Sequence, residues 1–368
     1  MPNNNKFPAR NIHKPKWEQS LMSSGTEAMN VHLVGSIGLD NVEEVFRSVG
    51  KLLGPYLRRV PDGEVGGRRL WISWQYPLLR ASAYLRPDPS GAVRPTNRFP
   101  LLTLAEGVKP ADLHFGELGY AREARASYLD FVAAREHGEL PKGIRFQVCL
   151  PTPFAVVSSV VVPAVLPVVE AAYERAMIAE VAALCRHIPH SDLCIQWDVC
   201  NEMVMWDGQP TDAVPGDEPR ENIISRMQRL CAAVPDDVEL GLHLCYGDFG
   251  AKHFVEPKDA AKMVEFANAL SRSIKRPIAY IHMPVPIERS DDAFHRPLGG
   301  LKLKDGTQLF LGVVHAKDGV EGAKARMSAA RRYAPKFGIA TECGMARARS
   351  EETVRTLLKI HADVCAGA

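Results

Sequence analysis

The chain has 368 residues, of which 46% are apolar and 24% are charged, the balance of a globular protein with a sizeable buried core. Its 45 Lys and Arg residues against 43 Asp and Glu residues give a formal net charge of +2, which argues against a nucleic-acid binder because such proteins usually carry a basic face. The most apolar stretch, residues 154–169, is shorter than a bilayer requires and is interrupted by Pro163 and Pro167, so no membrane span is predicted.

The N-terminal residues, Met1 to Trp17, are polar and lack the apolar segment of a secretory signal, so we expect a cytoplasmic protein. Eight cysteines in such a chain are expected to be reduced thiols or metal ligands rather than a disulfide framework. The composition of residues 1–29 predicts an N-terminal arm, followed by a single catalytic domain over residues 30–368. The sequence allows a homo-oligomer without specifying one.

Strand and helix patterns alternate along the chain. A strand at 31–34 is followed by a helical pattern at 41–53 and by a strand at 56–60. Residues 64–120 show no clear periodicity and are rich in Arg, Pro, Gly and aromatic residues, which predicts a long insertion after the second strand that covers a substrate or serves another function. The remaining expected helices are 121–137, 165–187, 218–233, 257–273, 319–333 and 350–366, and the remaining strands are 143–150, 193–197, 238–243, 278–282, 308–314 and 337–341.

Eight strands, nearly all followed by a helix, predict parallel βαβ units that close as an α/β fold of the (β/α)8 TIM barrel type. A doubly wound open sheet is the alternative. In a barrel, catalytic side chains lie at the C-terminal ends of the strands. Polar clusters fall at these ends: Gly35-Ser36, Asp62-Gly63-Glu64, Gln196-Trp197-Asp198, His243-Leu244-Cys245-Tyr246, His282, His315 and Glu342-Cys343-Gly344.

A metal site is predicted from three of these side chains. His243 and Cys245 are two residues apart at a strand end, a spacing that points both side chains to the same side. Cys343 is remote along the chain, but its strand opens onto the same mouth of the barrel. One imidazole and two thiolates suit zinc and leave a position for water or substrate, which is typical of catalytic zinc. Free cysteines are also common in protein cores, so a metal-free barrel that acts as a binding protein is the competing interpretation.

Several segments resemble the cobalamin-independent methionine synthases. The segment from Gly241 to Phe249, which contains His243-Leu-Cys245-Tyr246, resembles their zinc-binding segment, and Ala340 to Arg347 resembles their final strand. Val34-Gly35-Ser36, Asp62-Gly63-Glu64 and Ile195-Gln196-Trp197-Asp198 resemble three further strands, in the correct order over residues 31–347. The resemblance implies a barrel with Zn²⁺ as cofactor and a zinc-bound thiolate as nucleophile.

The departures from that family concern the substrate and the fourth ligand. There the Gln-x-Asp strand continues with Glu-Pro-Ala, in a region whose acidic groups engage the amino group of homocysteine; here Asp198 is followed by Val199-Cys200-Asn201, which puts an amino-acid substrate in doubt. The family's glutamate ligand is not matched, so His282, Glu288 or an open position could complete the site. The second barrel of the large methionine synthases is also absent from this chain.

In length and in its His-x-Cys…Cys set, the chain is similar to the epoxyalkane:coenzyme M transferases. The resemblance therefore implies zinc-dependent alkyl transfer to a small thiol, with epoxide opening by coenzyme M as the first expectation. The first alternative is methyl transfer to homocysteine or a related thiol. The second alternative is a metal-free barrel similar to uroporphyrinogen decarboxylase. The expected partners are the small thiol and an alkyl donor, with no nucleic acid and no membrane.

Further side chains are expected around the thiol. Acid–base or substrate-binding roles are assigned on position to Glu64, Asp198, Tyr246, His282 and His315. A sulfonate thiol would also require cations near the mouth, because guanidinium groups suit oxyanions, and the candidates are Arg58, Arg59, Arg68, Lys317 and Arg347. The alternatives are that the acidic residues cap helices and that the cations are solvated surface charges.

Overall fold

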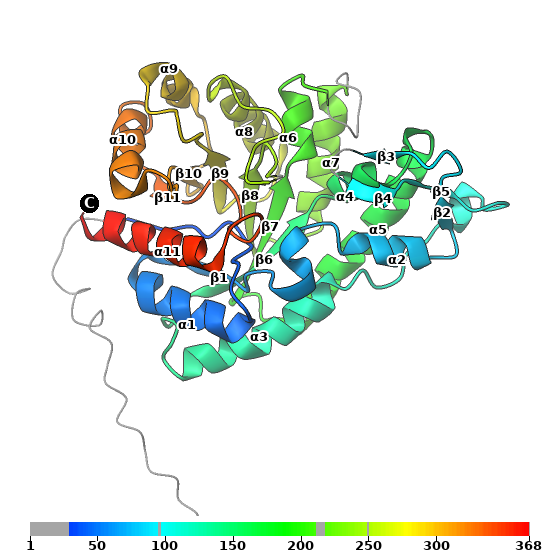
Figure 1. Ribbon diagram of the computed structural model, residues 1–368, viewed down its shortest axis with the longest axis horizontal. Helices are drawn as coiled ribbons and strands as arrows, with labels where there is room; N and C mark the ends of the chain where they lie inside the picture. Colours follow the sequence, from blue (N-terminus) through cyan, green and yellow to red (C-terminus); the bar gives the residue numbers. More distant parts are fainter. Residues whose placement is uncertain (1–28, 95–96, 211–217, 249, 368) are drawn as a thin grey trace, which may run out of the picture.

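The computed structural model describes residues 29–94, 97–210, 218–248 and 250–367. Its main sheet has seven strands in the order β1-β6-β7-β8-β9-β10-β11, and every neighbouring pair is parallel. The strands are β1 (Arg59–Pro61), β6 (Arg145–Pro151), β7 (Leu193–Val199), β8 (Glu239–Leu244), β9 (Tyr280–Pro284), β10 (Gln308–Gly312) and β11 (Gly338–Ile339). The sheet curls and helices surround it, so the fold is mixed α/β and resembles a TIM barrel (Figure 1).

The segment that was expected to form the first strand is held by isolated bridges instead of a regular ladder. Val31 is bridged in parallel to Leu57, just before β1, and to Ile339 of β11. Its amide donates to the Tyr56 carbonyl at 2.9 Å, and the His32 amide donates to the Ile339 carbonyl at 2.9 Å. This segment therefore lies between the two edge strands of the curled sheet. The predicted arm, apart from Met29, lies outside the described residues.

The helices predicted from periodicity are present with shifts of a few residues at their ends. The first begins after Asn41, whose side chain accepts the Glu44 amide and so caps the helix. These helices are α1 (Val42–Leu53), α3 (Tyr120–Glu136), α5 (Leu166–His187), α7 (Arg220–Ala232), α8 (Ala261–Ser273), α10 (Gly319–Arg331) and α11 (Glu351–Ala366). The shorter α-helices are α2 (Gln75–Ala81), α4 (Pro153–Val160), α6 (Asn201–Trp206) and α9 (Asp292–His295). The 3-10 helices are η2 (Gly54–Tyr56), η3 (Gly66–Leu70), η4 (Pro110–Asp112), η5 (Pro163–Val165) and η6 (Arg296–Gly300).

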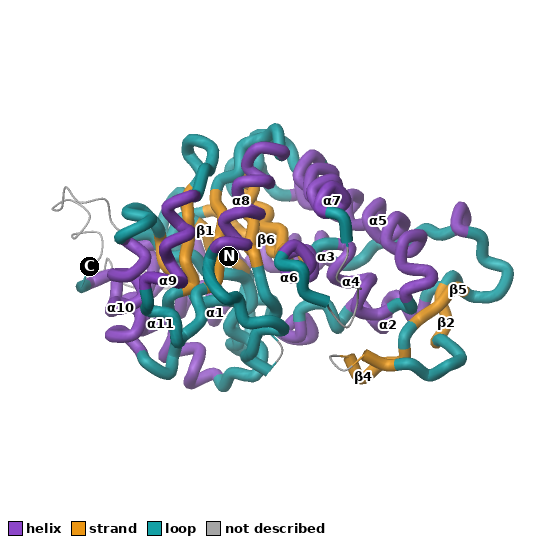
Figure 2. The backbone as a smooth tube through the Cα atoms, turned by 90° about the horizontal axis from the view of Figure 1, so that it is seen from above, coloured by secondary structure: helices purple, strands orange, loops and turns teal. Residues whose placement is uncertain are grey.

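The predicted long insertion forms an extension on one side of the sheet, as both views of the backbone show (Figure 1, Figure 2). It contains α2 and two antiparallel pairs, in which β2 (Leu85–Pro87) pairs with β5 (Leu102–Leu104) and β3 (Val93–Arg94) pairs with β4 (Asn97–Pro100). The Tyr173 hydroxyl of α5 donates to Oε1 of Gln75 in α2 at 2.9 Å, and Leu102 is bridged to Val161 after α4. The insertion is therefore tied to the rest of the fold and is not a free loop.

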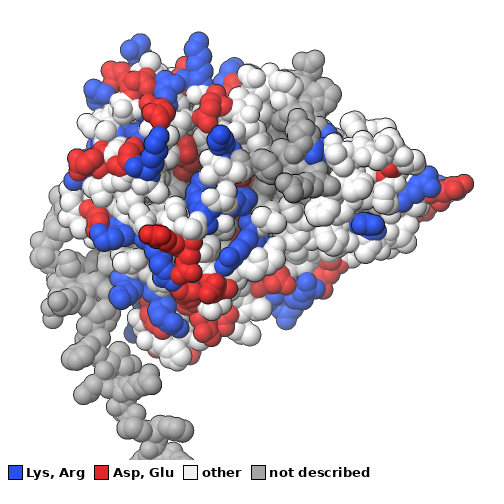
Figure 3. All heavy atoms as spheres, in the orientation of Figure 1, with Lys and Arg blue, Asp and Glu red and all other residues white. Residues whose placement is uncertain are grey.

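No helix in the described part of the chain is long and apolar enough to cross a bilayer. On the face shown in Figure 3, acidic and basic side chains are interspersed. That mixture agrees with the balance of 45 basic and 43 acidic residues in the whole chain.

Gly241 in β8 lies two residues before His243 and faces the ring of Tyr280. A Cβ at this position would overlap that ring, which is fully buried and whose hydroxyl donates to Gln196 Oε1 at 2.9 Å. We expect Gly241→Ala to lower the free energy of unfolding by about 1–3 kcal/mol, as overpacking of a core does, and urea denaturation will measure it. Gly116→Ala is the control, because no atom lies within 4 Å of a Cβ there. Equal unfolding midpoints for wild type and Gly241→Ala would contradict this account.

Candidate metal centre and active-site cavity

His243, Cys245 and Cys343 converge at the C-terminal ends of β8 and β11. One donor atom from each of the three side chains lies within 4.8 Å of the others, and the two sulfurs are 3.8 Å apart. All three residues are buried. The carboxyl ends of parallel strands lie at the same rim of a sheet. Residues at the ends of β8 and β11 therefore lie close together, although about a hundred positions separate them in the chain. The structure thus brings together the three residues that the sequence predicted as ligands.

The orientation of His243 suits a metal ligand. Its Nδ1 lies 2.7 Å from Nδ1 of His282, and its Nε2 is buried without a hydrogen-bond partner in the structure. Burial lowers the pKa of both imidazoles well below the usual range, so each carries one ring proton. When His243 donates from Nδ1 to His282, the lone pair on its Nε2 is free. Buried polar atoms seldom lack a partner, so a free imidazole nitrogen on a residue that lies within 4.8 Å of two sulfurs through one of its ring nitrogens fits a bound zinc ion.

The two thiols are held by further contacts. The Cys245 sulfur accepts the Gly247 amide at 3.3 Å, and the Cys343 sulfur accepts Nη2 of Arg347 at 3.2 Å. Without a cation, the Cys200 side chain and burial raise the pKa of the Cys245 thiol. The Cys245 side chain and burial likewise raise the pKa of the Cys343 thiol. A divalent cation reverses this tendency, because a coordinating thiol loses its proton. The site is therefore suited to thiolates only when a metal is bound.

Arg347 places a positive charge next to the sulfurs. Its Nε donates to the Asp248 carbonyl at 3.0 Å, and its Nη2 lies 3.4 Å from the carboxylate of the same residue. Burial opposes the charged form, but Cys343 and Asp248 outweigh burial and raise the pKa of the guanidinium. The Arg347 side chain therefore remains charged at the edge of the metal centre.

A cavity of about 390 Å³ opens beside the three ligands, and all three line it. The insertion contributes Trp71 and Ile72 to the wall, and the loop after β8 contributes Phe254 and Val255. These side chains give that part of the cavity wall an apolar surface. The structure therefore places part of the predicted insertion in the wall of this cavity.

Glu64 and Asp198, both predicted as acid–base residues, line the cavity together. Asp198 accepts Nε2 of Gln196 at 2.8 Å and Nε1 of Trp71 at 3.2 Å. Burial raises the pKa of Asp198 to about 7, and burial together with the charge of Asp198 raises the pKa of Glu64 to about 8. Near neutral pH this pair therefore holds a proton inside the cavity, where a reacting group can receive it.

Arg68, one of the predicted cations, contacts the turn that precedes Glu64. Glu64 has a φ of 48°, a left-handed conformation that costs a non-glycine residue of the order of 1–3 kcal/mol. Its amide donates to Oδ1 of Asp62 at 2.9 Å, and Nη2 of Arg68 donates to Oδ2 of the same carboxylate at 2.8 Å. Arg68, which was expected to bind an anionic substrate, instead stabilises the turn that places Glu64 in the cavity.

The other predicted cations do not all reach the cavity. Arg58 and Arg59 lie at the N-terminal end of the sheet, where Arg58 donates to Asn30 at 3.4 Å and Arg59 pairs with Glu239. The Lys317 side chain is 81% exposed and lies 3.9 Å from Glu288, itself 80% exposed. Of the predicted cations, Arg347 alone lines the cavity. The structure therefore places Arg58, Arg68 and Lys317 in contacts outside the cavity lining, and Glu288, one of the options for a fourth ligand, on the exposed surface.

Three predicted acid–base residues are also placed outside the cavity lining. The Tyr246 hydroxyl donates to Oδ2 of Asp207 at 2.9 Å, because neighbours along an extended segment alternate and the residue after Cys245 points away. His315 donates from Nε2 to the Val285 carbonyl at 2.9 Å. His282 is fully buried and contacts His243, so it lies behind a proposed ligand and not in the cavity wall.

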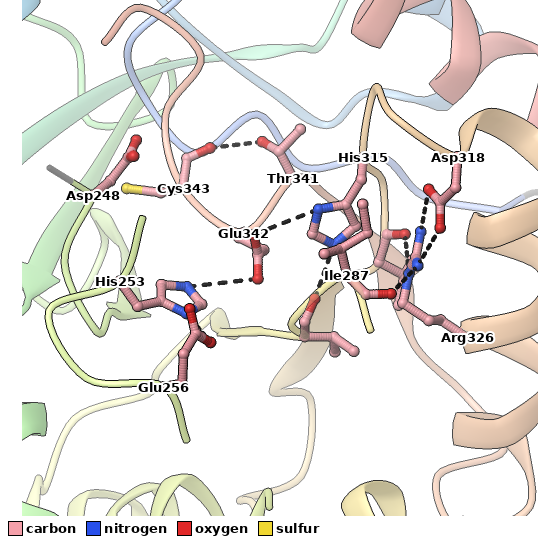
Figure 4. A network of polar contacts seen from close by, with 12 residues as sticks. Asp248, His253, Glu256, Ile287, His315, Asp318, Arg326, Thr341, Glu342 and Cys343 are labelled. Atoms are coloured by element: carbon pink, nitrogen blue, oxygen red, sulfur yellow. Dashed lines mark hydrogen bonds and ion pairs between the residues drawn. The ribbon is translucent and has the colours of Figure 1, made fainter. Parts of the chain in front are cut away.

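A polar network next to Cys343 was not predicted. The Glu342 carboxyl lies between two imidazoles, with Oε1 3.5 Å from Nε2 of His253 and Oε2 3.4 Å from Nδ1 of His315 (Figure 4). Nδ1 of His253 is 2.9 Å from the Glu256 carboxylate. Burial raises the pKa of Glu342 to about 7 and lowers that of His315 to about 4. The sequence signal was the position of Glu342 at a strand end; nothing in the sequence marked His253.

His282 should control how tightly the centre holds a metal. His282→Ala removes the acceptor that keeps the proton of His243 on Nδ1, so we expect zinc affinity to fall by about 10–100-fold, as loss of such outer partners does. Competition with a chromogenic chelator will measure it. His315→Ala is the control, because the His315 imidazole is only 11% exposed and its contacts are with Glu342 and the Val285 carbonyl, not with His243. Unchanged zinc affinity in His282→Ala would show that His243 does not need this partner.

No protein-family model matches the chain, and no curated protein matches it by sequence. Among solved structures, a putative vitamin-B12-independent methionine synthase from Listeria monocytogenes is 12% identical, with a TM-score of 0.54, over 93% of this chain and 99% of that one. A B12-independent methionine synthase from Shewanella sp. W3-18-1, in complex with selenomethionine, is 15% identical, with a TM-score of 0.46, over 73% of this chain and 68% of that one. The Listeria protein is 12% identical to this chain in sequence, and at so low an identity the structural similarity shows a shared fold.

Proposed function

We propose that this chain is a zinc-dependent enzyme that alkylates a small thiol, on a (β/α)8 barrel in which the segment around Val31 takes the place of the eighth strand. The observation that carries the proposal is the convergence of His243, Cys245 and Cys343 within 4.8 Å on the wall of a cavity. Zinc at such a site supplies the charge that ionises a thiol at neutral pH. The fold shared with a putative methionine synthase supports this reading. A metal-free decarboxylase has no use for this ligand set.

The remaining cavity residues have separate roles in the proposal. Trp71 and Phe254 exclude water from the space in which the thiol meets its electrophile. Arg347 balances negative charge on the sulfurs. A leaving group that departs as an anion requires a proton, and Glu64, with a pKa of about 8, still holds one at neutral pH. We assign the proton donor to Glu64, with Asp198 as the neighbour that keeps it protonated.

The charges in the cavity favour a thiol that carries an ammonium group. Asp198 lines the cavity and is partly ionised at neutral pH, because its pKa is about 7, so it attracts a cationic group and disfavours a sulfonate. Although the Glu-Pro-Ala element is missing, the protonated Glu64 carboxyl next to Asp198 still offers an oxygen that can accept a hydrogen bond from an ammonium group. Methyl transfer to homocysteine or a related amino thiol is therefore the first proposal. Epoxide opening by coenzyme M is the second, and Arg347 at the cavity wall is the observation that favours it.

One experiment separates these reactions. The zinc-loaded protein is incubated with homocysteine or coenzyme M, each with methyltetrahydrofolate or epoxypropane, and the thioether is identified by mass spectrometry. We expect methionine from homocysteine and the methyl donor. A thioether from coenzyme M and epoxypropane alone would select the second proposal. Zinc-loaded protein that forms no thioether from any of the four pairs would refute both.

A further inference from the structure

A third cysteine packs against the proposed ligands. Cys200 is 1% exposed, forms one buried cluster with Cys245 and Cys343, and lines the same cavity. The pairing of β7 with β8 brings it there, because Val199 is in register with Leu244 and the Cys245 amide donates to the Val199 carbonyl at 3.1 Å. Cys200 follows Val199 and Cys245 follows Leu244, so these two cysteines lie next to each other where the chain leaves the sheet.

Other donor groups near the centre are engaged elsewhere. His282 contacts His243 through Nδ1, and the Glu342 carboxyl lies between His253 and His315 (Figure 4). Asp198 accepts hydrogen bonds on both of its oxygens. Among the described residues, Cys200 is the donor that already touches a proposed ligand and faces the cavity.

We propose that Cys200 is a third sulfur ligand, so that the resting metal is held by one imidazole and three thiolates. This inference rests on the proposed function, because it requires an ion at the centre. The three donor atoms within 4.8 Å of one another belong to His243, Cys245 and Cys343, so the Cys200 side chain must turn about χ1 to join them. A change between staggered rotamers provides that motion. The same rotation would let Cys200 leave when a substrate thiol takes the fourth position, and the departing Cys200 sulfur would then take up the proton that the substrate thiol gives up.

The charge around the sulfurs agrees with three thiolates. One imidazole and two thiolates with Zn²⁺ form a neutral centre, and a third thiolate makes it singly negative. Arg347 donates to the Cys343 sulfur at 3.2 Å. Arg347 and Arg349 both pair with Asp248, at 3.4 and 3.0 Å, so two guanidinium groups share this one carboxylate. That arrangement leaves positive charge at the sulfur cluster, which a third thiolate offsets.

X-ray absorption at the zinc edge of the wild-type, zinc-loaded chain tests the ligand set directly. We expect three sulfur neighbours and one nitrogen at rest, and two sulfurs in Cys200→Ser. The affinity of Cys200→Ser for zinc, measured by chelator competition, should fall by more than the roughly 10–100-fold that loss of an outer partner costs. In cobalt-substituted protein, the sulfur-to-cobalt absorption band should weaken in the same variant. Cys185→Ser in α5, outside this cluster, is the matched control and should leave all three measurements unchanged.

The outcomes separate this inference from the proposed function. Two sulfurs in the wild-type spectrum with zinc bound would overturn the role of Cys200 and leave zinc-dependent thiol alkylation standing. A wild-type chain that binds no zinc would overturn the proposed function itself. The wild-type spectrum needs no substitution, so it decides the question even if Cys200→Ser does not fold.

Discussion

Cys343→Ser should lose its metal and most of its thiol alkylation. A serine hydroxyl at this position cannot replace a thiolate 3.8 Å from the Cys245 sulfur, so the donor set loses one of its anions. Without the metal, the substrate thiol returns to a pKa of about 8.5, and only about 3% of it is ionised at pH 7. The rate should therefore fall by at least about 30-fold from ionisation alone, and the lost positioning of the sulfur adds to this.

Metal content measured by inductively coupled plasma mass spectrometry checks this result. We expect about one zinc per chain in wild type and almost none in Cys343→Ser or Cys245→Ser. Cys185→Ser, a half-buried cysteine of α5, should keep the wild-type metal content and activity. Full zinc occupancy in both ligand variants would place the metal elsewhere in the chain.

Glu64→Gln should make the protein more stable than wild type at alkaline pH. In the native state, burial and the neighbouring Asp198 raise the pKa of Glu64 from 4.5 to about 8. Between these two values the unfolded chain binds fewer protons than the native chain, so wild type loses stability as the pH rises from about 4.5 to about 8. The change in pKa corresponds to at most about 5 kcal/mol. Glutamine does not ionise, so the variant avoids this loss.

Urea denaturation at about pH 5 and about pH 8.5 will measure the difference, which should be small at the lower pH and favour the variant at the higher one. Glu321→Gln is the control, because that side chain is 88% exposed. The same substitution removes the proposed proton donor, so alkylation should fall by about 10²–10⁴-fold although the fold becomes more stable. A variant with wild-type activity and wild-type pH dependence would remove Glu64 from the mechanism.

Sequence patterns were sufficient for the alternation of strands and helices and for the three proposed ligands. Apolar periodicity reports which side of a helix or strand is buried, so helices such as α1 and α5 were located within a few residues. The ligands were found because all parallel strands of a barrel end on one rim. Topology placed several polar clusters at that rim, and the residue types of His243, Cys245 and Cys343, together with the resemblance of their segments to cobalamin-independent methionine synthases, singled out these three.

Only the tertiary structure decided which partner each polar side chain contacts at the carboxyl ends of the strands. Arg68, Arg58 and Lys317 looked as suitable as Arg347 in the sequence, but only Arg347 lies beside the sulfurs. The contact of His282 with His243, and that of Cys200 with Cys245, depend on the register of β7, β8 and β9. Local patterns encode which residues are buried, whereas the direction of a polar side chain depends on distant segments that the folded sheet brings next to it.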